Sequence, residues 1–186
     1  MLSATDIEER YHWRKEDHEE IWWSNTQKHL WLFYFLATLF GPDKLIVELG
    51  TYTGACSTVA WAAAVNDTGG SLVTVDVKDR GQEERLCEEE NVSVIVGDDI
   101  VLGRVWETPI DLLYIDDGHA PEHVEEEIEA WAQHVKVGGL VLFHDTCPGK
   151  GPWLAFQELV SWEGWEIAFK MPHTWNDGLF AARRTA

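Results

Sequence analysis

Cysteine and basic residues are both scarce in this chain. Its three cysteines, Cys56, Cys87 and Cys147, have neither disulfide-framework nor metal-site spacing, and a sparse, odd count is typical of a reducing cytoplasm. Only 14 lysines and arginines accompany 33 acidic residues, which gives a formal net charge of -19. Such an acidic chain is poorly suited to binding nucleic acid or an anionic membrane through surface charge. We therefore expect a cytoplasmic protein with neither kind of partner.

Long apolar runs are absent as well. LWLFYFLATLF, residues 30–40, is too short to span a membrane and is followed by a Gly-Pro pair. The first twenty residues are polar and charged, which argues against a signal peptide and favours a helix. Without repeats or low-complexity linkers, 186 residues fit a single domain. We predict a core over residues 25–184 and a helical extension or lid over residues 1–24.

Apolar runs alternate with helical stretches through most of the chain. Strands that are apolar throughout and separated by helices indicate a parallel sheet covered on both faces. The last two runs, WEIAFK and GLFAARR, are joined by a link too short for a crossover helix, so they predict an antiparallel pair at the sheet edge. The sequence therefore predicts a doubly wound, Rossmann-like α/β fold with a mostly parallel seven-stranded sheet and helices on both faces. The expected strands before that pair are residues 45–49, 72–75, 92–96, 112–115 and 140–143, and the expected helices are residues 29–40, 57–65, 83–90, 121–134 and 153–162.

Two of these strands run into aspartate and histidine, in LLYIDDGH (residues 112–119) and in GGLVLFHDT (residues 138–146). Ligands of open parallel sheets bind beyond the carboxyl ends of the strands. Because those ends share one edge of the sheet, polar side chains that follow them should meet at a single rim. The side chains in question are Glu48, Asp76, Asp98, Asp99, Asp116, Asp117, His144 and Asp145.

The segment IVELGTYTGACST leads from a strand to a helix through Gly50 and Gly54, which permit a sharp turn and close approach to a ligand. It has neither the Gly-x-Gly-x-x-Gly dinucleotide pattern nor the lysine of a Walker loop. Glu48 would repel a pyrophosphate but could accept hydrogen bonds from a cationic amine. Asp76 stands at the usual spacing for a carboxylate on ribose hydroxyls, and Asp98 or Asp99 could meet an adenine amino group. Amine, ribose and adenine in that order suit S-adenosylmethionine, whereas the alternative is a plain glycine turn among solvated acids.

Taken together, ELGTYTG, VTVDV, GDD and IDDGH…GGLVLFHDT resemble class I S-adenosylmethionine-dependent methyltransferases. The spacing is most similar to the catechol O-methyltransferase-like enzymes, and it also resembles the sugar O-methyltransferase and cephalosporin-hydroxylase-like branch with its IDxxH…HD or ED motif. Cys56 departs from the serine that usually lies near the methionine carboxylate, so Ser57 or a backbone group would take that contact. The expected cofactor-binding residues are Glu48, Gly50, Thr51, Tyr52, Gly54, Ser57, Asp76, Asp98, Asp99 and Asp116.

The resemblance also implies a divalent metal held by Asp116, His144 and Asp145, with His144 standing where relatives carry a carboxylate. His119 occupies the position of a general-base lysine, so His119 and Asp116 are the expected catalytic residues. A divalent cation would lower the pKa of an acceptor hydroxyl, and a neutral histidine could take its proton. This ligand set suits manganese, iron or zinc as readily as magnesium. Alternatively, His119 caps the helix that starts near Pro121, His144 is a core histidine, or the cluster binds no metal.

Several other polar residues have ordinary structural readings. Asp117 is expected to be a turn residue, and the glutamate runs 88–90 and 125–127 are expected to be solvated helix faces. His123, His134 and His173 are expected at the surface.

The chain is rich in tryptophan, with 11 residues. Aromatic faces stack on planar or sugar rings, so an aromatic or glycosidic acceptor is plausible. Trp153 and Trp175 are expected in loops near the rim, and residues 11–23 could form a lid. For any single tryptophan, the alternative is core packing or the interface of a homo-oligomer.

These observations favour O-methylation of a small hydroxylated molecule by an S-adenosylmethionine-dependent enzyme with divalent-metal assistance. The alternatives are a hydroxylase-like or non-catalytic relative of the same fold, and a metal-dependent hydrolase. Glu48, Gly50, Gly54 and Asp76 argue against the hydrolase, which needs no adenosyl pocket.

Overall fold

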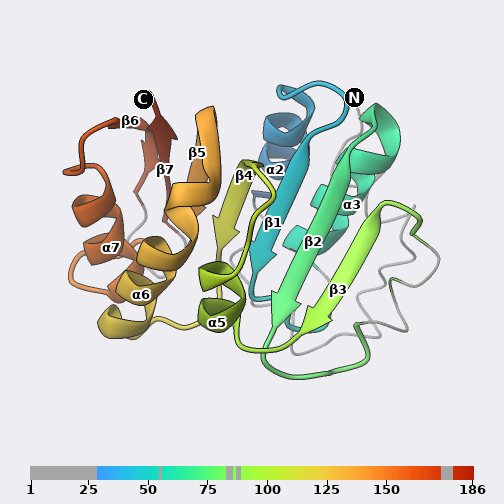
Figure 1. Cartoon of the computed structure of the whole chain (residues 1–186), viewed down its shortest axis with the longest axis horizontal. Coiled ribbons are helices and arrows are strands. Elements are labelled where there is room, and N and C mark those ends of the chain that lie inside the picture. Colours follow the sequence, from blue (N-terminus) through green and yellow to red (C-terminus); the bar gives the residue numbers. More distant parts are fainter. Residues whose placement is uncertain (1–28, 55, 83–85, 87–88, 173–177) are drawn as a thin grey trace.

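The strands of the chain form a seven-stranded sheet in the order β3-β2-β1-β4-β5-β7-β6 (Figure 1). The computed structural model describes residues 29–54, 56–82, 86, 89–172 and 178–186. The first five strands along the chain run parallel, whereas β7 pairs antiparallel with both β5 and β6. The predicted mostly parallel sheet with an antiparallel edge pair is therefore confirmed. The strands are β1 Leu45–Leu49, β2 Ser71–Asp76, β3 Val92–Val96, β4 Ile110–Ile115, β5 Val135–Phe143, β6 Trp165–Met171 and β7 Leu179–Arg184.

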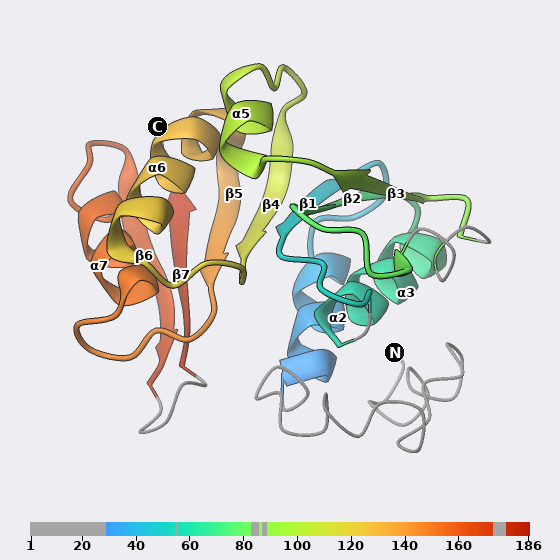
Figure 2. The same ribbon diagram turned by 90° about the horizontal axis from the view of Figure 1, so that it is seen from below.

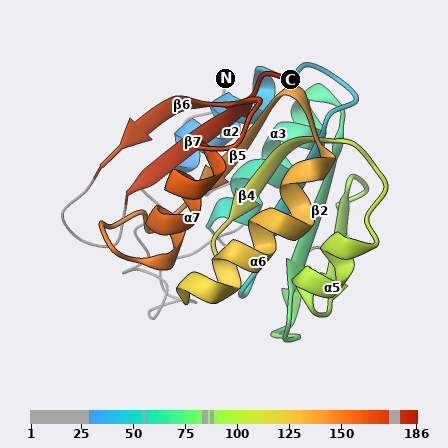
Figure 3. The same ribbon diagram turned by 60° about the vertical axis from the view of Figure 1, so that its left-hand side comes forward.

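Helices cover both faces of the sheet, as predicted (Figure 2). α2 and α3 pack together on one face, and Figure 3 shows α6 lying between α5 and α7 on the other. No helix in the described part of the chain is both long and apolar enough to cross a membrane. The helices are α2 Leu30–Thr38, α3 Ser57–Thr68, α5 Asp99–Arg104, α6 Pro121–Trp131, the 3-10 turn η4 Ala132–His134, and α7 Gly151–Leu159.

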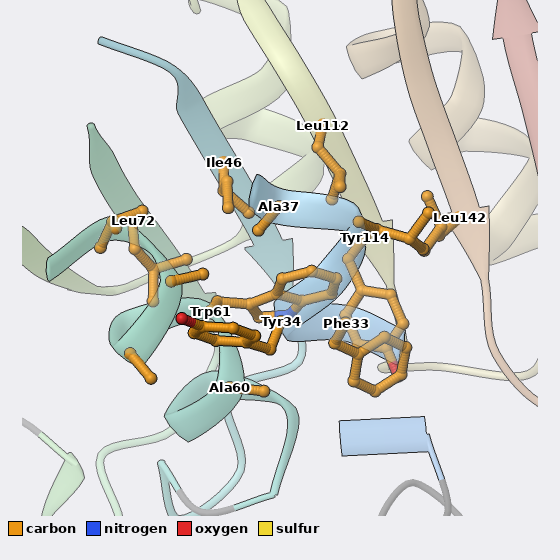
Figure 4. Close-up of a cluster of buried hydrophobic side chains, with 14 of the residues drawn as sticks. Phe33, Tyr34, Ala37, Ile46, Ala60, Trp61, Leu72, Leu112, Tyr114 and Leu142 are labelled. Atoms are coloured by element: carbon orange, nitrogen blue, oxygen red, sulfur yellow. The ribbon is translucent and has the colours of Figure 1, made fainter. Parts of the chain in front are cut away.

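Alternation along the central strands creates two hydrophobic cores. In β4, Leu112 and Tyr114 join the core beneath α2 and α3, whereas Leu113 and Ile115 join the core beneath α6 and α7. Successive side chains of a strand point to opposite faces, so a strand that is apolar throughout must be covered on both sides. The first core contains a cluster of tilted aromatic rings, with the Phe33 ring 5.0 Å from that of Tyr114 at an interplanar angle of 58° (Figure 4).

The structure corrects the sequence-based assignment at two elements. Asp98 and Asp99 were expected to follow a strand, with one of them near an adenine amino group; the Asp98 side chain also accepts a hydrogen bond from Val101 N and caps α5, a helix that was not predicted. β5 begins at Val135 rather than at residue 140, and its register against β4 shifts between Val135 and Leu140, where Gly138 takes φ +88°. Two predicted features, the N-terminal extension or lid and most of the helix over residues 83–90, lie outside the described residues.

Candidate active site at the carboxyl edge of the sheet

The loop after β1 passes directly beneath the end of β4. Gly50 has φ +98°, and a Cβ atom built on it would lie 2.3 Å from the backbone oxygen of Asp116. The Gly50 N–H donates to Val75 O, and the Asp116 N–H donates to Leu49 O, so backbone hydrogen bonds hold the ends of β1, β2 and β4 together. Only glycine tolerates both this backbone conformation and this contact. At Gly50, the loop therefore presents backbone atoms without a side chain at the rim predicted from the sequence.

Glu48 lies beneath this loop and is fully buried. Its Oε2 accepts hydrogen bonds of 2.7 Å from the hydroxyls of Thr58 and Thr74, and the Thr74 hydroxyl lies 2.5 Å from that of Thr51. Burial raises the pKa of Glu48 to about 7, although hydroxyl groups, including that of Ser57, oppose the change. This network links β1, β2, α3 and the loop, so Glu48 holds the loop in position.

Glu48 should make the stability of the protein depend on pH. Its pKa is 4.5 for an ordinary glutamate and about 7 in the fold, so the folded state binds the proton more tightly than the unfolded chain. Stability should therefore fall as pH rises from about 4.5 through about 7, by up to about 3 kcal/mol. In Glu48→Gln this component should vanish. Urea unfolding at about pH 5 and about pH 8 measures it as the difference between wild type and variant.

The exposed residue Glu163 provides a matched control, because Glu163→Gln makes the same chemical change on the surface. Its unfolding free energy should follow the wild type at both pH values. Parallel curves for wild type and Glu48→Gln would show that Glu48 does not hold its proton in the folded state.

A cavity of about 370 Å³ opens beside the loop, over the ends of β1, β2, β3 and β4. Six of the predicted cofactor residues line it: Gly50, Tyr52, Asp76, Asp98, Asp99 and Asp116. The other four, Glu48, Thr51, Gly54 and Ser57, do not line it. Glu48, Thr51 and Ser57 are buried, and Gly54 takes φ +71° with a built Cβ 3.2 Å from Leu86 Cδ1. Direct contacts from these four residues to a cofactor remain predictions.

Asp76 lines one side of the cavity and is held in place by several hydrogen bonds. Its Oδ2 accepts a hydrogen bond from Tyr52 N at 2.8 Å, and its Oδ1 accepts bonds from Lys78 N and the Arg80 guanidinium. Arg80 also lies over the Tyr52 ring, 4.9 Å from its centre. Sequence reasoning missed Arg80, although its position four residues after Asp76 was a usable signal. The carboxylate is thereby oriented toward the cavity.

A second acidic group lies where the cavity meets α5 and α6, and we call it the α5–α6 cluster. Burial, assisted by the charge of Asp117, raises the pKa of both Asp99 and Glu127. His123 Nε2 lies 3.1 Å from Asp117 Oδ2. Asp117 is therefore more than a turn residue, and His123 is half-buried rather than free at the surface. The cluster consists of Asp99, Asp117, His123 and Glu127.

Glu127 contradicts the prediction of a solvated face, because it is fully buried. Val124 and Ile128 are buried in the core and lie four residues apart in α6, and Glu127 follows Val124 by three residues. Residues at these spacings share one face of a helix. The helical periodicity therefore indicated that Glu127 faces the core, although a run of three glutamates is typical of a solvated face. Glu125 and Glu126 are more accessible, as expected.

The third group joins the ends of β4 and β5 and contains the predicted metal ligands Asp116, His144 and Asp145. His144 is buried, and its Nδ1 lies 3.3 Å from Asp116 Oδ1 and 3.2 Å from Asp145 Oδ1. Burial alone would lower the pKa of His144, but the two carboxylates raise it to about 10. The hydroxyl of Tyr114 donates to Asp116 Oδ2 at 2.8 Å and orients that carboxylate.

These residues fit a divalent cation. One ligand atom from each of Asp116, His144 and Asp145 lies within 4.8 Å of the others. Among the described residues, neither ring nitrogen of His144 has a partner in hydrogen-bond geometry, and neither does Asp145 Oδ1. Buried polar atoms normally have such partners, so this set of oxygen and nitrogen donors is prepared for a ligand.

His119 stands at the open side of this group, with 44% of its side chain exposed. Its Nε2 lies 3.0 Å from Asp145 Oδ2, and this hydrogen bond raises the pKa of His119. Although burial alone would raise the pKa of Asp145, His119 and His144 lower it to about 2. The N-cap of α6 is Ala120, without a side-chain cap, so His119 contacts Asp145 instead of capping the helix.

The tryptophans that the structure describes serve mainly in packing. Trp61 and Trp131 are fully buried, and Trp153 belongs to α7, where it packs against the second core instead of standing in a loop. The expected roles of Trp175 and of residues 11–23 fall outside the described residues.

The fold and the position of these groups define a Rossmann-like methyltransferase architecture, and several solved structures share it. The O-methyltransferase TomG from Streptomyces achromogenes, in complex with S-adenosylmethionine, has a TM-score of 0.70 and 21% identity, covering 100% of this chain and 91% of that one. The methyltransferase PaMTH1 of Podospora anserina, bound to S-adenosylhomocysteine, has a TM-score of 0.72 and 17% identity, covering 100% and 89%. An O-methyltransferase from Bacillus cereus, in complex with S-adenosylhomocysteine, has a TM-score of 0.66 and 16% identity, covering 98% and 96%.

A family model described as a methyltransferase domain matches residues 47–146, more than half of the chain. The protein therefore belongs to this methyltransferase family, and the resemblance inferred from its motifs is confirmed. The matched region begins in β1 and ends just after β5, so it includes the loop, the cavity and the Asp116–His144–Asp145 group.

Proposed function

We propose that this protein is an S-adenosylmethionine-dependent O-methyltransferase that acts on a small hydroxylated acceptor with the help of a divalent cation. The observation that carries the proposal is the double position of Asp116. This residue lines the cavity predicted to hold the cofactor, and it also belongs to the group of three candidate metal ligands. A methyl donor and an acceptor hydroxyl would thus be held side by side.

Different residues would bind different parts of the cofactor. Asp76 would accept hydrogen bonds from the ribose hydroxyls, and Asp98 would face the adenine amino group. The bare backbone at Gly50 would let the cofactor approach the sheet closely. Glu48 would keep the loop in place and offer the cationic amine its Oε1, which has no hydrogen-bond partner among the described residues. When bound, S-adenosylmethionine supplies a methyl group on a positively charged sulfur, an electrophile for an acceptor oxygen.

The Asp116–His144–Asp145 group, together with His119, would bind and deprotonate the acceptor. A divalent cation held by Asp116, His144 and Asp145 would lower the pKa of an acceptor hydroxyl. His119 would take the hydroxyl proton on its imidazole, and Asp145 would orient and stabilise the resulting imidazolium. The exposure of His119 leaves room for an acceptor on this side. The chemistry favours an aromatic or glycosidic molecule with neighbouring hydroxyls, since two oxygens can then be held together.

The decisive experiment is a screen of hydroxylated acceptors with cofactor that carries a labelled methyl group. Catechols and glycosylated phenols should accept label on oxygen, and mass spectrometry locates it. A hydroxylase-like or non-catalytic relative would bind the cofactor without forming methylated product. Release of a hydrolysed acceptor without label would instead support the metal-dependent hydrolase.

Chelation should separate the two binding functions. In excess EDTA we expect methyl transfer to fall to background, because the acceptor hydroxyl loses its cation, and added Mg²⁺ or Mn²⁺ should restore it. Cofactor binding, measured by calorimetry with S-adenosylhomocysteine, should change little. Asp145→Asn should reproduce the effect of the chelator without the chelator. Full turnover in EDTA, with no metal detected by elemental analysis, would contradict metal assistance.

A homo-oligomeric state and a cytoplasmic location remain predictions. The absence of a binding surface for nucleic acid is likewise an expectation based on the acidity of the chain.

A further inference from the structure

The proposed reaction gives no role to the α5–α6 cluster. Asp99 comes from the first turn of α5, and Asp117 from the loop after β4. His123 and Glu127 come from α6, four residues apart, so they lie on the same face of the helix. One ligand atom from each of the four side chains lies within 4.8 Å of all the others. Three carboxyl groups and one imidazole therefore converge on one point.

Glu127 is a second feature that points to a ligand at this cluster. It is fully buried, and the groups within reach of its side-chain oxygens among the described residues, Asp99 and Asp117, are carboxyls too. Asp99 Oδ2 is also buried, without a hydrogen-bond donor in the described part of the chain. Buried carboxyl groups of this kind are costly unless they are neutralised and their oxygens are engaged.

Within the described residues, basic side chains do not neutralise these buried carboxyl groups. His123 is the only cationic partner of the cluster in an ion pair there, through Asp117. The nearest arginine along α5, Arg104, pairs instead with Glu126, and both of those side chains are more than half exposed.

The side chains of the cluster are also held in fixed positions. The indole N–H of Trp131 donates to the backbone oxygen of Asp99 at 3.1 Å. A Cβ atom on Gly118 would lie 2.6 Å from His123 Cδ2, so the imidazole packs tightly under the loop after β4. A shared proton would neutralise one carboxylate but leave other donor atoms unused, whereas a cation would engage all four groups. Fixed ligands of this kind favour a cation site.

We propose that Asp99, Asp117, His123 and Glu127 bind a divalent transition-metal ion. Three oxygens and one imidazole nitrogen suit Mn²⁺ or Zn²⁺ better than Mg²⁺. The site is distinct from the Asp116–His144–Asp145 group and uses none of its residues. It would tie the loop after β4 to α5 and α6, beside the cavity that Asp99, Asp117 and His123 line.

The test counts metal ions on the full chain, without cofactor or acceptor. Protein stripped with a chelator and then dialysed is titrated with Mn²⁺, and free ion is measured by electron paramagnetic resonance, with a parallel Zn²⁺ titration by calorimetry. Glu127→Gln should weaken one equivalent of binding about 100-fold or more, as expected for a lost ligand. The matched control Glu126→Gln changes the neighbouring exposed glutamate and should retain that equivalent.

Asp145→Asn distinguishes this site from the one in the proposed function, because it should retain the equivalent that Glu127→Gln loses. His123→Ala provides a second variant and should lose the same equivalent as Glu127→Gln. Melting curves in chelator show whether each variant folds, and Mn²⁺ should raise the melting temperature of Asp145→Asn but not that of the double variant Asp145→Asn/Glu127→Gln. The proposal is overturned if Glu127→Gln binds Mn²⁺ and Zn²⁺ as the wild type does, or if Asp145→Asn binds neither ion.

Discussion

Replacing Asp76 with alanine should weaken the binding of S-adenosylmethionine and S-adenosylhomocysteine about 100-fold or more. A hydrogen bond to a charged group contributes roughly 1.5–3 kcal/mol, and a ribose offers two hydroxyls to this carboxylate. The variant also removes the acceptor of the Tyr52 N–H and the partner of Arg80, so the wall of the cavity loses its anchor. Calorimetric titration with S-adenosylhomocysteine measures the change directly.

Asp111 offers a control with matched chemistry at the other end of the sheet. Like Asp76, it accepts a backbone N–H, that of Leu45, and pairs with a basic side chain, that of Lys136. Asp111→Ala should therefore cost comparable stability while leaving cofactor affinity nearly unchanged. Asp76→Asn keeps one oxygen acceptor and should fall between alanine and wild type. If Asp76→Ala binds the cofactor as tightly as Asp111→Ala does, the ribose is not at Asp76.

The second large effect is expected at His119. His119→Ala should lower turnover about 100-fold or more, the typical loss when a general base is removed. Cofactor affinity should hardly change, because His119 does not line the cavity and turns toward Asp145 instead. Steady-state kinetics with a saturating acceptor and calorimetry with S-adenosylhomocysteine measure the two quantities separately.

Rescue by added imidazole distinguishes proton transfer from a structural role. The His119 side chain is partly exposed, so the alanine variant leaves a space that free imidazole can reach from solvent. Imidazole should raise the turnover of His119→Ala and leave the wild type unaffected. The control His134→Ala removes a histidine from η4, where the ring contacts Gly103 O, and should keep wild-type turnover. Wild-type turnover in His119→Ala would mean that the acceptor hydroxyl loses its proton directly to water.

The two main groups at the rim differ in how the chain holds them. The cavity side depends on backbone geometry, since Gly50 passes against Asp116 and hydrogen bonds join β1, β2 and β4. The metal side depends on side chains that constrain each other, since Tyr114 orients Asp116 while His119 and His144 both face Asp145. Asp116 belongs to both groups, so its substitution should impair cofactor binding and acceptor activation together. Substitution of Asp76 should impair cofactor binding, whereas substitution of Asp145 should impair acceptor activation.

The sequence by itself determined the architecture and the location of the site. Apolar runs separated by helical stretches predicted the parallel strands, and the short final link predicted the antiparallel pair of β6 and β7. Gly50 and the acids at the strand ends predicted the rim. These features are local, because strand periodicity, helix periodicity and the glycine conformation depend on neighbours along the chain.

Only the tertiary structure decided which polar groups meet. It buried Glu48 against the hydroxyls of Thr58, Thr74 and Ser57 and paired Arg80 with Asp76. It also turned His119 toward Asp145 rather than toward the start of α6. A run of glutamates in α6 has the composition of a solvated face, yet the packing of α6 against α5 buried Glu127 among other acids. The physical reason is that the charge and hydrogen bonding of a side chain depend on partners from distant segments, and only packing brings those partners within reach.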